Sequence, residues 1–456
     1  MARKAALHNL GCKVNAYETE AMQQLLEAAG YEIVPFQETA DVYIINTCSV
    51  TNVADKKSRQ MLHRAKKQNP AAVVVAAGCY VQTAAEELKK DAMVDVIIGN
   101  NRKKDLTTIL ERFFREKQTS ASGEGKAADG DGKEAPEPVI DINRTREYEE
   151  LSVSRTAEHT RAFLKVQDGC NQFCTYCVIP YARGRVRSRR PEKVEEEVRQ
   201  LAAAGYREVV LTGIHLSSYG TDFAKEEAQS LLGLIRRIHA IEGIRRIRLG
   251  SLEPRIVTEE FARALASMEK ICPHFHLSLQ SGCDTVLARM NRRYTTQEYR
   301  QGCEYLRAAF AHPAITTDVI VGFPGETEEE FAETCAFLEE IGFYEMHIFK
   351  YSRRAGTKAA VMPGQIAESV KASRSETLQE LESRMSRAFR ESRLGCEDEV
   401  LLEEPMVLNG ETWMVGHTPE YIKVAVSTGS GARNAMVSGV LSHMLTNEIV
   451  CLEPQK

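Results

Sequence analysis

The sequence has no long hydrophobic run. None of its apolar stretches approaches the roughly 20 residues that a membrane-spanning helix needs. The first residues, MARKAALHNLGC, contain no apolar segment long enough for a secretory signal. These absences predict a cytoplasmic protein with no membrane partner, in a compartment where thiols stay reduced. The 12 cysteines then favour metal binding or catalysis over disulfides.

The sequence also lacks an excess of positive charge, because its formal net charge is -5 at pH 7. The whole surface is therefore not attractive to nucleic acid, and any RNA partner would need a local basic patch. A hydrophobic content of 43% suits a soluble globular protein. A chain of 456 residues is too long for one ordinary core, so two to four domains are expected, and no internal repeat is visible.

Strand-like runs alternate with helical ones over most of the chain, which predicts parallel sheets covered by helices. In the first hundred residues the strands are KAALHNL, DVYIINT and AAVVVAAG. From Ala162 to about Tyr351 they are AFLKVQ, REVVLTGI, IRRIRLGS, HFHLSLQ, ITTDVIVG and EMHIFKY. Six parallel strands predict an open, partial barrel, since a complete one has eight.

Two other stretches differ in pattern. Residues 116–138 are rich in Gly, Ser, Ala and charge with almost nothing to bury, which predicts a flexible linker. After the long helical pattern from Gly364 to about Leu394, short β runs and the hairpin signal Asn409-Gly410 predict a small all-β module. The expected units are 1–113 (N-terminal α/β), 114–158 (flexible linker or insertion), 159–394 (central barrel and trailing helix) and 395–456 (small β-barrel).

Three cysteines lie within eight residues in QDGCNQFCTYC: Cys170, Cys174 and Cys177, spaced C-x3-C-x2-C. Structural zinc prefers four ligands, usually as two close pairs, and the chain has no second close pair of cysteines. An iron-sulfur cubane held by three thiolates leaves one iron open to bind and activate a small molecule. The spacing therefore favours a cluster over zinc or simple burial.

This motif, with Tyr176 before the last cysteine, resembles the signature of the radical S-adenosylmethionine (SAM) superfamily from about Thr160 to Ala360. The resemblance implies that the three cysteines hold a 4Fe-4S cluster whose open iron takes the methionine end of SAM. It also implies that residues at the other strand ends line the SAM pocket, where parallel α/β folds gather ligands. The pocket set is Tyr176, Thr212, Gly213, Ser251, Glu253, Gln280, Gly322 and Phe323, with Pro324 and Gly325 beside it.

Cys12, Cys48 and Cys79 each follow one of the three N-terminal strands. Each alone is readily explained as a small buried residue. Because the carboxyl ends of parallel strands meet at one edge of a sheet, the three together predict a shared site.

The runs LGCKVNAYETEAM, INTCSVT and AAGCY resemble the N-terminal domain of the methylthiotransferases, and the C-terminal β module resembles a TRAM domain. The resemblance spans nearly the whole chain. It implies an auxiliary 4Fe-4S cluster on Cys12, Cys48 and Cys79, again with an open iron, where sulfur is carried. LGCKVNAYETE is most similar to the type that acts on tRNA bearing N6-threonylcarbamoyladenosine at position 37. Relatives acting on isopentenyladenosine usually have Gln-Met at Lys13-Val14, and those acting on a ribosomal protein aspartate tend to have Pro-Lys.

The resemblance implies methylthiolation of C2 of the adenine in the tRNA anticodon loop. One SAM would methylate a sulfur at the auxiliary cluster, and a second would supply the radical that removes an unreactive C-H hydrogen. The implied partners are tRNA, an electron donor such as flavodoxin or ferredoxin, and a sulfur source.

A dense basic run, YARGRVRSRRP, follows the cluster loop and predicts RNA contact. Its arginines are Arg183, Arg185, Arg187, Arg189 and Arg190, and Arg292 and Arg293 either add to them or face SAM. The alternative is that these arginines are solvent-exposed charges without a binding role. The C-terminal module carries few basic residues, so it either positions RNA by shape or buttresses the core.

Other functions stay open at this point. The same chemistry could act on isopentenyladenosine in tRNA or on a ribosomal protein aspartate. A different class is a non-enzymatic iron-sulfur RNA-binding redox sensor, which would have no use for a SAM pocket. A zinc-stabilised RNA-binding scaffold would give colourless protein.

Overall fold

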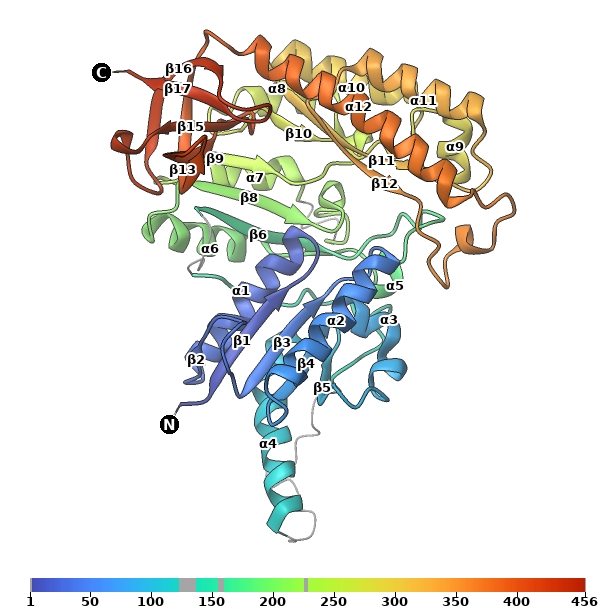
Figure 1. Ribbon diagram of the computed structural model, residues 1–456, viewed down its shortest axis with the longest axis vertical. Coiled ribbons are helices and arrows are strands. Elements are labelled where there is room, and N and C mark those ends of the chain that lie inside the picture. The colour runs from blue at the N-terminus through green and yellow to red at the C-terminus, as the bar shows by residue number, and fades with distance from the viewer. Residues whose placement is uncertain (1, 123–136, 155–159, 225–228, 456) are drawn as a thin grey trace.

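The chain folds into an N-terminal α/β sheet, a central partial barrel and a small C-terminal barrel, which confirms the predicted fold class (Figure 1). The computed structural model describes residues 2–122, 137–154, 160–224 and 229–455. Across these ranges, no helix combines the length and the apolar character that crossing a lipid bilayer requires.

The N-terminal sheet is parallel, with strand order β2-β1-β3-β4-β5. Its central strands are buried on both faces, because alternate residues pack against different helices. Val74 and Ala76 lie in the core under α2 and α3, whereas Val73 and Val75 lie in the core under α1 and α4. The elements are β1 (Lys4–Asn9), α1 (Lys13–Ala28), β2 (Glu32–Ile33), β3 (Val42–Thr47), α2 (Asn52–Gln68), β4 (Val73–Gly78), α3 (Cys79–Leu88), β5 (Val96–Ile98), η1 (Lys103–Asp105) and α4 (Leu106–Ser122).

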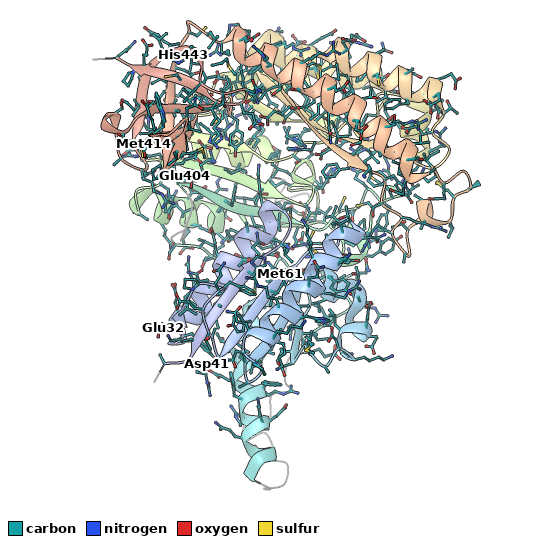
Figure 2. The ribbon with its side chains drawn as sticks, viewed as in Figure 1. Glu32, Asp41, Met61, Glu404, Met414 and His443 are labelled. Atoms are coloured by element: carbon teal, nitrogen blue, oxygen red, sulfur yellow. The ribbon has the colours of Figure 1, made fainter. Side chains whose placement is uncertain are left out.

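The carboxyl ends of these strands point toward the central barrel. Asp41, immediately before β3, lies at the end of the sheet that faces away from the rest of the molecule (Figure 2). The opposite ends of β1, β3 and β4, where the three N-terminal cysteines follow, therefore lie at the interface with the barrel (Figure 1).

The central barrel contains all six predicted strands. They form sheets of order β7-β6-β8-β9 and β10-β11-β12, joined by bridges such as Leu252 to Leu277. The elements are β6 (Arg161–Asp168), α5 (Ile179–Arg183), β7 (Arg187–Ser188), α6 (Pro191–Ala203), β8 (Glu208–Gly213), η2 (Leu216–Ser218), α7 (Leu231–His239), β9 (Arg246–Leu249), η4 (Pro254–Ile256), α8 (Glu259–Ala266), β10 (His274–His276), α9 (Asp284–Arg289), α10 (Thr296–Ala309), β11 (Ala314–Val321), α11 (Glu328–Ile341), β12 (Glu345–Lys350), η5 (Lys358–Val361) and α12 (Glu368–Ser392).

The two faces of the barrel strands differ in chemistry. Outward residues such as Leu211, Ile247 and Val319 form the main hydrophobic core with the surrounding helices. Since side chains alternate along a strand, the polar residues between them face inward. Arg248 on β9 and Asp318 on β11 are two of these, so the interior of the barrel is polar rather than a packed apolar core.

The C-terminal unit is a closed barrel of order β13-β14-β15-β17-β16. The predicted hairpin at Asn409-Gly410 is confirmed, because both residues have positive φ and connect paired strands. The elements are β13 (Glu397–Leu408), β14 (Glu411–His417), β15 (Lys423–Ser427), η6 (Thr428–Ser430), β16 (Met436–Met444) and β17 (Val450–Pro454).

This small barrel packs against the amino-terminal ends of the central strands. Arg161, at the start of β6, binds both carboxylate oxygens of Glu403 at 2.9 and 3.1 Å. Arg248 donates to the carbonyl of Pro419 at 2.7 Å. Of the two roles considered for this module, buttressing the core has these direct contacts.

The prediction of a flexible linker over 114–158 is wrong for two segments, 114–122 and 137–154. Helix α4 continues to Ser122, supported by the Arg112–Glu116 pair one turn apart. Residues 137–154 form an ordered strap, since Leu151 and Val153 are buried beside Tyr17 and Ala21 of α1. Residues 123–136 and 155–159 of that stretch lie outside the described part of the chain.

Candidate active site

The three-cysteine loop follows β6, as predicted. Gly169 reverses the chain there at φ +69°, and a Cβ on it would lie 1.9 Å from the carbonyl oxygen of Arg185. Burial, with a smaller contribution from the neighbouring Cys174, raises the pKa of Cys170 to about 11 and that of Cys177 to about 12. Thiolates at such positions need a positive group beside them, and iron supplies it when it displaces the thiol protons.

Two further residues lie against this loop: Arg292, for which the sequence left RNA contact and SAM contact open, and His215, which the sequence did not single out. Arg292 donates to the Cys174 sulfur at 3.4 Å and to the carbonyl of Ser278 at 3.0 Å, so it faces the loop and not an RNA surface. His215 lies 3.4 Å from Gln172 within the loop. Burial, followed by Arg292, lowers the pKa of His215 to about 4, so its ring is neutral near pH 7.

The residues predicted to line a SAM pocket divide into two groups. Thr212, Gly213, Ser251, Glu253 and Gln280 lie at or just after the carboxyl ends of their strands, around the cysteine loop. Phe323 is fully buried and its ring contacts Tyr176 edge-on, while a Cβ on Gly322 would lie 2.3 Å from the Lys371 side chain. In this structure Gly322 and Phe323 therefore support Tyr176 and α12 and do not line an open pocket.

Cys12, Cys48 and Cys79 come together at the end of the N-terminal sheet. Cys12 caps α1, Cys79 begins α3, and the adjacent strands β3 and β4 are paired up to Thr47 and Gly78. Burial raises the pKa of Cys48 to about 11, and Cys79 and Cys12 are among the neighbours that raise it. The structure therefore places the three sulfurs at one site.

Buried charges lock this sheet onto the barrel. Glu18 on α1 lies 2.9 Å from Lys103, 2.7 Å from Lys165 of β6 and 2.5 Å from Arg183 of α5, and all four side chains are essentially inaccessible. Burial alone raises the pKa of the Glu18 carboxyl, but Arg183, Lys103 and Lys165 outweigh it and hold the pKa well below its ordinary value. Glu18 is therefore an anion in the interface.

Arg183 connects the two cysteine sites. Its Nε donates to the Cys79 sulfur at 3.2 Å and its Nη2 to Asn15 at 2.6 Å. Its Nη1 lies 3.4 Å from Asp168, two residues before Cys170. Helix α3, which begins at Cys79, also packs on α5, which begins just after Cys177.

The predicted RNA role of the arginine run is wrong for three of its members, because they are buried and paired with carboxylates: Arg183, Arg187 and Arg189. Arg187 lies 3.5 Å from Asp168, and Arg189 pairs with Glu197 and Glu150. Of the five arginines in the run, Arg190 is exposed and Arg185 is partly exposed.

The cysteine sites fit clusters better than single ions. Sulfurs around one tetrahedral zinc lie about 3.8 Å apart, given Zn–S bonds of about 2.3 Å. Within the described ranges, neither cysteine trio has all its sulfurs within 4.8 Å of one another. A cluster accepts wider spacing because each thiolate binds a different iron.

Gly11 gives a direct test of the N-terminal site. Its φ is +106°, and a Cβ there would lie 2.9 Å from both Cβ and Sγ of Cys48. We predict that Gly11→Ala displaces Cys48 and lowers the iron bound after anaerobic reconstitution, measured by iron and sulfide analysis. Gly30→Ala is the matched control, since Gly30 has φ +83° with nothing within 4 Å of a new Cβ. That control should lose about 1–2 kcal/mol of stability to backbone strain and keep its iron.

Fold and site together define a class of protein: a partial α/β barrel with a three-cysteine loop after its first strand is a radical SAM protein. Residues 164–338 match the model of the radical SAM superfamily, and residues 4–99 match the uncharacterized protein family UPF0004. The fold resembles the radical S-adenosylmethionine methyltransferase TsrM from Kitasatospora setae, with TM-score 0.57 and 18% identity over 79% of this chain and 77% of that one.

Curated relatives are more specific. The chain is 43% identical to the threonylcarbamoyladenosine tRNA methylthiotransferase MtaB of Bacillus subtilis, over 92% of this chain and 89% of the relative. It is 35% identical to the tRNA-2-methylthio-N(6)-dimethylallyladenosine synthase of Pelotomaculum thermopropionicum, over 95% of this chain and 96% of the relative. The chain belongs to the family of radical SAM tRNA methylthiotransferases.

Proposed function

We propose that this protein methylthiolates C2 of N6-threonylcarbamoyladenosine at position 37 of tRNA, giving 2-methylthio-N6-threonylcarbamoyladenosine, with two 4Fe-4S clusters. The observation that carries the proposal is the pair of cysteine trios on opposite sides of one interface, with Arg183 between them. Two relatives, from Bacillus subtilis and Aquifex aeolicus, are both named threonylcarbamoyladenosine tRNA methylthiotransferases, and this chain is 43% and 42% identical to them.

Cys170, Cys174 and Cys177 would hold one cluster, and Cys12, Cys48 and Cys79 the other. When bound, the clusters supply the electron that cleaves SAM and an open iron for sulfur. The protein contributes N–H donors to ligand sulfurs, from Arg292 to Cys174 and from Arg183 to Cys79, and such hydrogen bonds shift cluster potentials.

Each turnover would replace the C2 hydrogen of adenine by a methylthio group and consume two SAM molecules. One SAM gives its methyl group to the sulfur and leaves as S-adenosylhomocysteine. The other leaves as methionine and 5′-deoxyadenosine, which carries away the C2 hydrogen. A cytoplasmic electron donor of the flavodoxin or ferredoxin type and a sulfur source complete the balance.

The remaining RNA-contact proposals rest on accessible groups. The guanidinium of Arg185 lies 4.7 Å from the Phe173 ring centre, beside the cluster loop, and Arg190 and Arg293 are exposed. An arginine held on an aromatic ring keeps N–H groups free for phosphates.

The proposal is tested by anaerobic reconstitution followed by incubation with reductant, SAM and tRNA, with nucleosides read by mass spectrometry. We expect a product heavier than threonylcarbamoyladenosine by one methylthio group. Product only on tRNA bearing dimethylallyladenosine would favour the second candidate function, which the relative from Pelotomaculum thermopropionicum supports at 35% identity. Intact clusters with neither SAM cleavage nor product would return the protein to a sensor role.

A further inference from the structure

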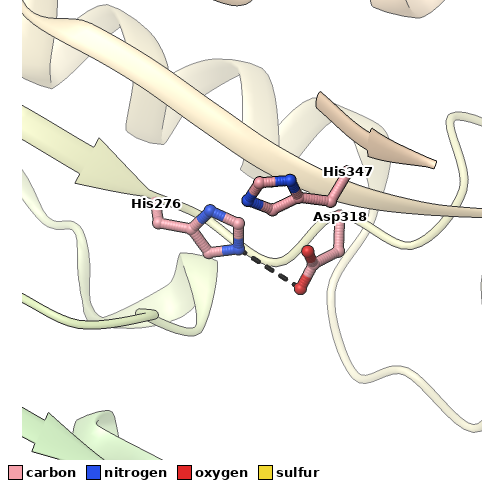
Figure 3. Close-up of side chains that lie close together, drawn as sticks. All are labelled: His276, Asp318 and His347. Atoms are coloured by element: carbon pink, nitrogen blue, oxygen red, sulfur yellow. Dashed lines mark ion pairs between the residues drawn. The ribbon is translucent and has the colours of Figure 1, made fainter. Parts of the chain in front are cut away.

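Three side chains of the kinds that bind metal ions meet inside the central barrel: His276, Asp318 and His347 (Figure 3). They come from the neighbouring strands β10, β11 and β12, and none of them belongs to either cysteine site. One ligand atom of each lies within 4.8 Å of those of the other two. Within the described ranges, no other three His, Cys, Asp or Glu side chains lie as close together. The proposed methylthiolation gives this cluster no role.

The register of the sheet brings the three side chains to one face. Val319 packs outward into the main hydrophobic core, so Asp318 beside it faces the barrel interior. Asp318 is paired with His347 in the β11–β12 register. His276 is paired with Thr316, one inward position before Asp318. Three paired strands therefore fix the cluster, and no loop has to order before it forms.

The spacing of the cluster suits a single ion. Nε2 of His276 lies 3.2 Å from a carboxylate oxygen of Asp318. Two ligands on neighbouring positions of one ion lie about 3.0–3.4 Å apart, given metal–ligand bonds of about 2.0–2.2 Å. The third ligand, His347, stacks on the His276 ring with ring centres 5.7 Å apart. Because its ligand atom lies within 4.8 Å of the other two, a shift of about 1.5 Å brings it to the same spacing.

The second nitrogen of His276 has the support that metal-binding histidines use. Its Nδ1 lies 3.0 Å from the hydroxyl of Thr316. When this hydroxyl accepts the Nδ1–H, Nε2 is left without a proton and faces Asp318. In the metal-free protein the ring can instead donate from Nε2 to the carboxylate, and the hydroxyl then donates to Nδ1. An ion that takes the place of this one proton leaves the contact with Thr316 intact.

An ion can reach the cluster and finds a suitable charge there. His347 is exposed, and 26% of the Asp318 side chain is accessible. Within the described part of the chain, no lysine or arginine lies at ion-pair distance from Asp318. Arg248, the inward cation on β9, is paired with Glu208 at 2.8 Å. Two imidazoles and one carboxylate suit zinc and iron(II), whereas calcium and magnesium prefer oxygen ligands alone.

We propose that His276, Asp318 and His347 bind one divalent transition-metal ion, of the zinc or iron(II) class, inside the barrel. Three protein ligands leave further coordination positions open to water or to an oxygen atom of a bound ligand. Asp318 lies three residues before β11 ends at Val321, about 10 Å inside the barrel. Its carbonyl accepts the backbone N–H of Gln280, one of the predicted SAM-pocket residues, at 2.8 Å. The ion is therefore a Lewis acid in the interior that faces the SAM pocket, whichever nucleoside the enzyme modifies.

The test uses the full-length protein with its clusters reconstituted anaerobically, so that the cluster cysteines are occupied. Zn²⁺ is the probe, because such a site binds it more tightly than Fe²⁺. After equilibrium dialysis, zinc, iron and sulfide are counted, and we expect about one zinc per chain in addition to the cluster iron. X-ray absorption at the zinc edge should show four or more nitrogen or oxygen neighbours at about 2.0–2.2 Å and no sulfur at about 2.3 Å.

Variants locate the ion. Asp318→Asn and His347→Ala should each weaken zinc binding about a hundredfold or more, since the loss of an outer partner alone costs about tenfold to a hundredfold. Thr316→Val removes such an outer partner and should cost about that smaller amount. His63→Ala is the matched control, because His63 forms a similar pair with Asp91 at 2.7 Å but belongs to no group of three within the described ranges. That control should keep the wild-type affinity.

Wild type that binds no zinc beyond its clusters would overturn the inference. A sulfur neighbour in the absorption spectrum would assign the zinc to cysteines and overturn it as well. If Asp318→Asn loses its iron and its circular dichroism signal together, that variant has lost its fold, and His347→Ala decides. His347 is exposed and forms no hydrogen bond within the described ranges, so His347→Ala is expected to fold. Wild-type zinc affinity in His347→Ala would show that the ion is bound elsewhere, whereas weakened binding with full iron supports the site.

Discussion

Replacing Glu18 by Gln is expected to lower the free energy of unfolding by about 3–5 kcal/mol, because it removes one partner of a buried ion network. Lys103, Lys165 and Arg183 all lie within 2.9 Å of the Glu18 carboxylate. After the substitution, Asp168 is the nearest anion left for Lys165 and Arg183, at 2.6 and 3.4 Å. The loss of stability should arise mainly from weaker docking of the N-terminal sheet on the barrel.

Urea unfolding measured by circular dichroism tests this, with a second probe from fluorescence. The single tryptophan, Trp413, lies in β14 of the C-terminal barrel, so its emission reports that unit and not the interface. Glu18→Gln should shift the circular dichroism midpoint more than the tryptophan midpoint. Glu196→Gln is the matched control, since Glu196 pairs with Lys193 on the surface and should cost at most about 1 kcal/mol. Equal shifts for the two variants would contradict a structural role for the network.

Most of the fold could be predicted because local patterns of apolar and polar residues determine where its strands and helices form. Runs such as VVVAA in β4 are apolar on both faces, and each is followed by a helical period, so strands and helices could be placed before the topology was known. The strands of the two larger units that were missed are short: β2 and β7 have two residues each, and β5 has three. Too few residues alternate in such strands to give a signal.

The arginine run shows why part of the site could not be predicted. In the sequence, Arg183 and Arg189 stand among glycine and other arginines, which is typical of a solvated or RNA-binding segment. Their partners are Glu18, which is 165 residues from Arg183, and Glu197, on the following helix. Only the docking of α1 on β6 brings the first pair together.

The cysteines were predictable because their spacing and their positions after strands reflect the site directly. That makes the largest functional effect easy to state. Replacing Cys12, Cys48 and Cys79 together by Ala should remove half of the bound iron. The variant should still cleave SAM when reduced, because Cys170, Cys174 and Cys177 lie on a separate loop with their own support from Arg292. It should form no methylthiolated nucleoside, since the site proposed to carry sulfur is gone.

The reciprocal triple variant at Cys170, Cys174 and Cys177 should also lose half of the iron, but it should lose SAM cleavage and product together. Cys335→Ala is the control, because Cys335 is a half-buried thiol on α11 outside both sites, and it should keep all the iron. Iron and sulfide analysis measures cluster content, 5′-deoxyadenosine release measures SAM cleavage, and nucleoside mass spectrometry measures the methylthiolated product. Full iron in the Cys12, Cys48 and Cys79 variant would mean that the second cluster is held elsewhere. Half the iron with product still formed would mean that sulfur reaches the adenine by a route that avoids the N-terminal sheet, and the interface built around Arg183 would then have a structural role alone.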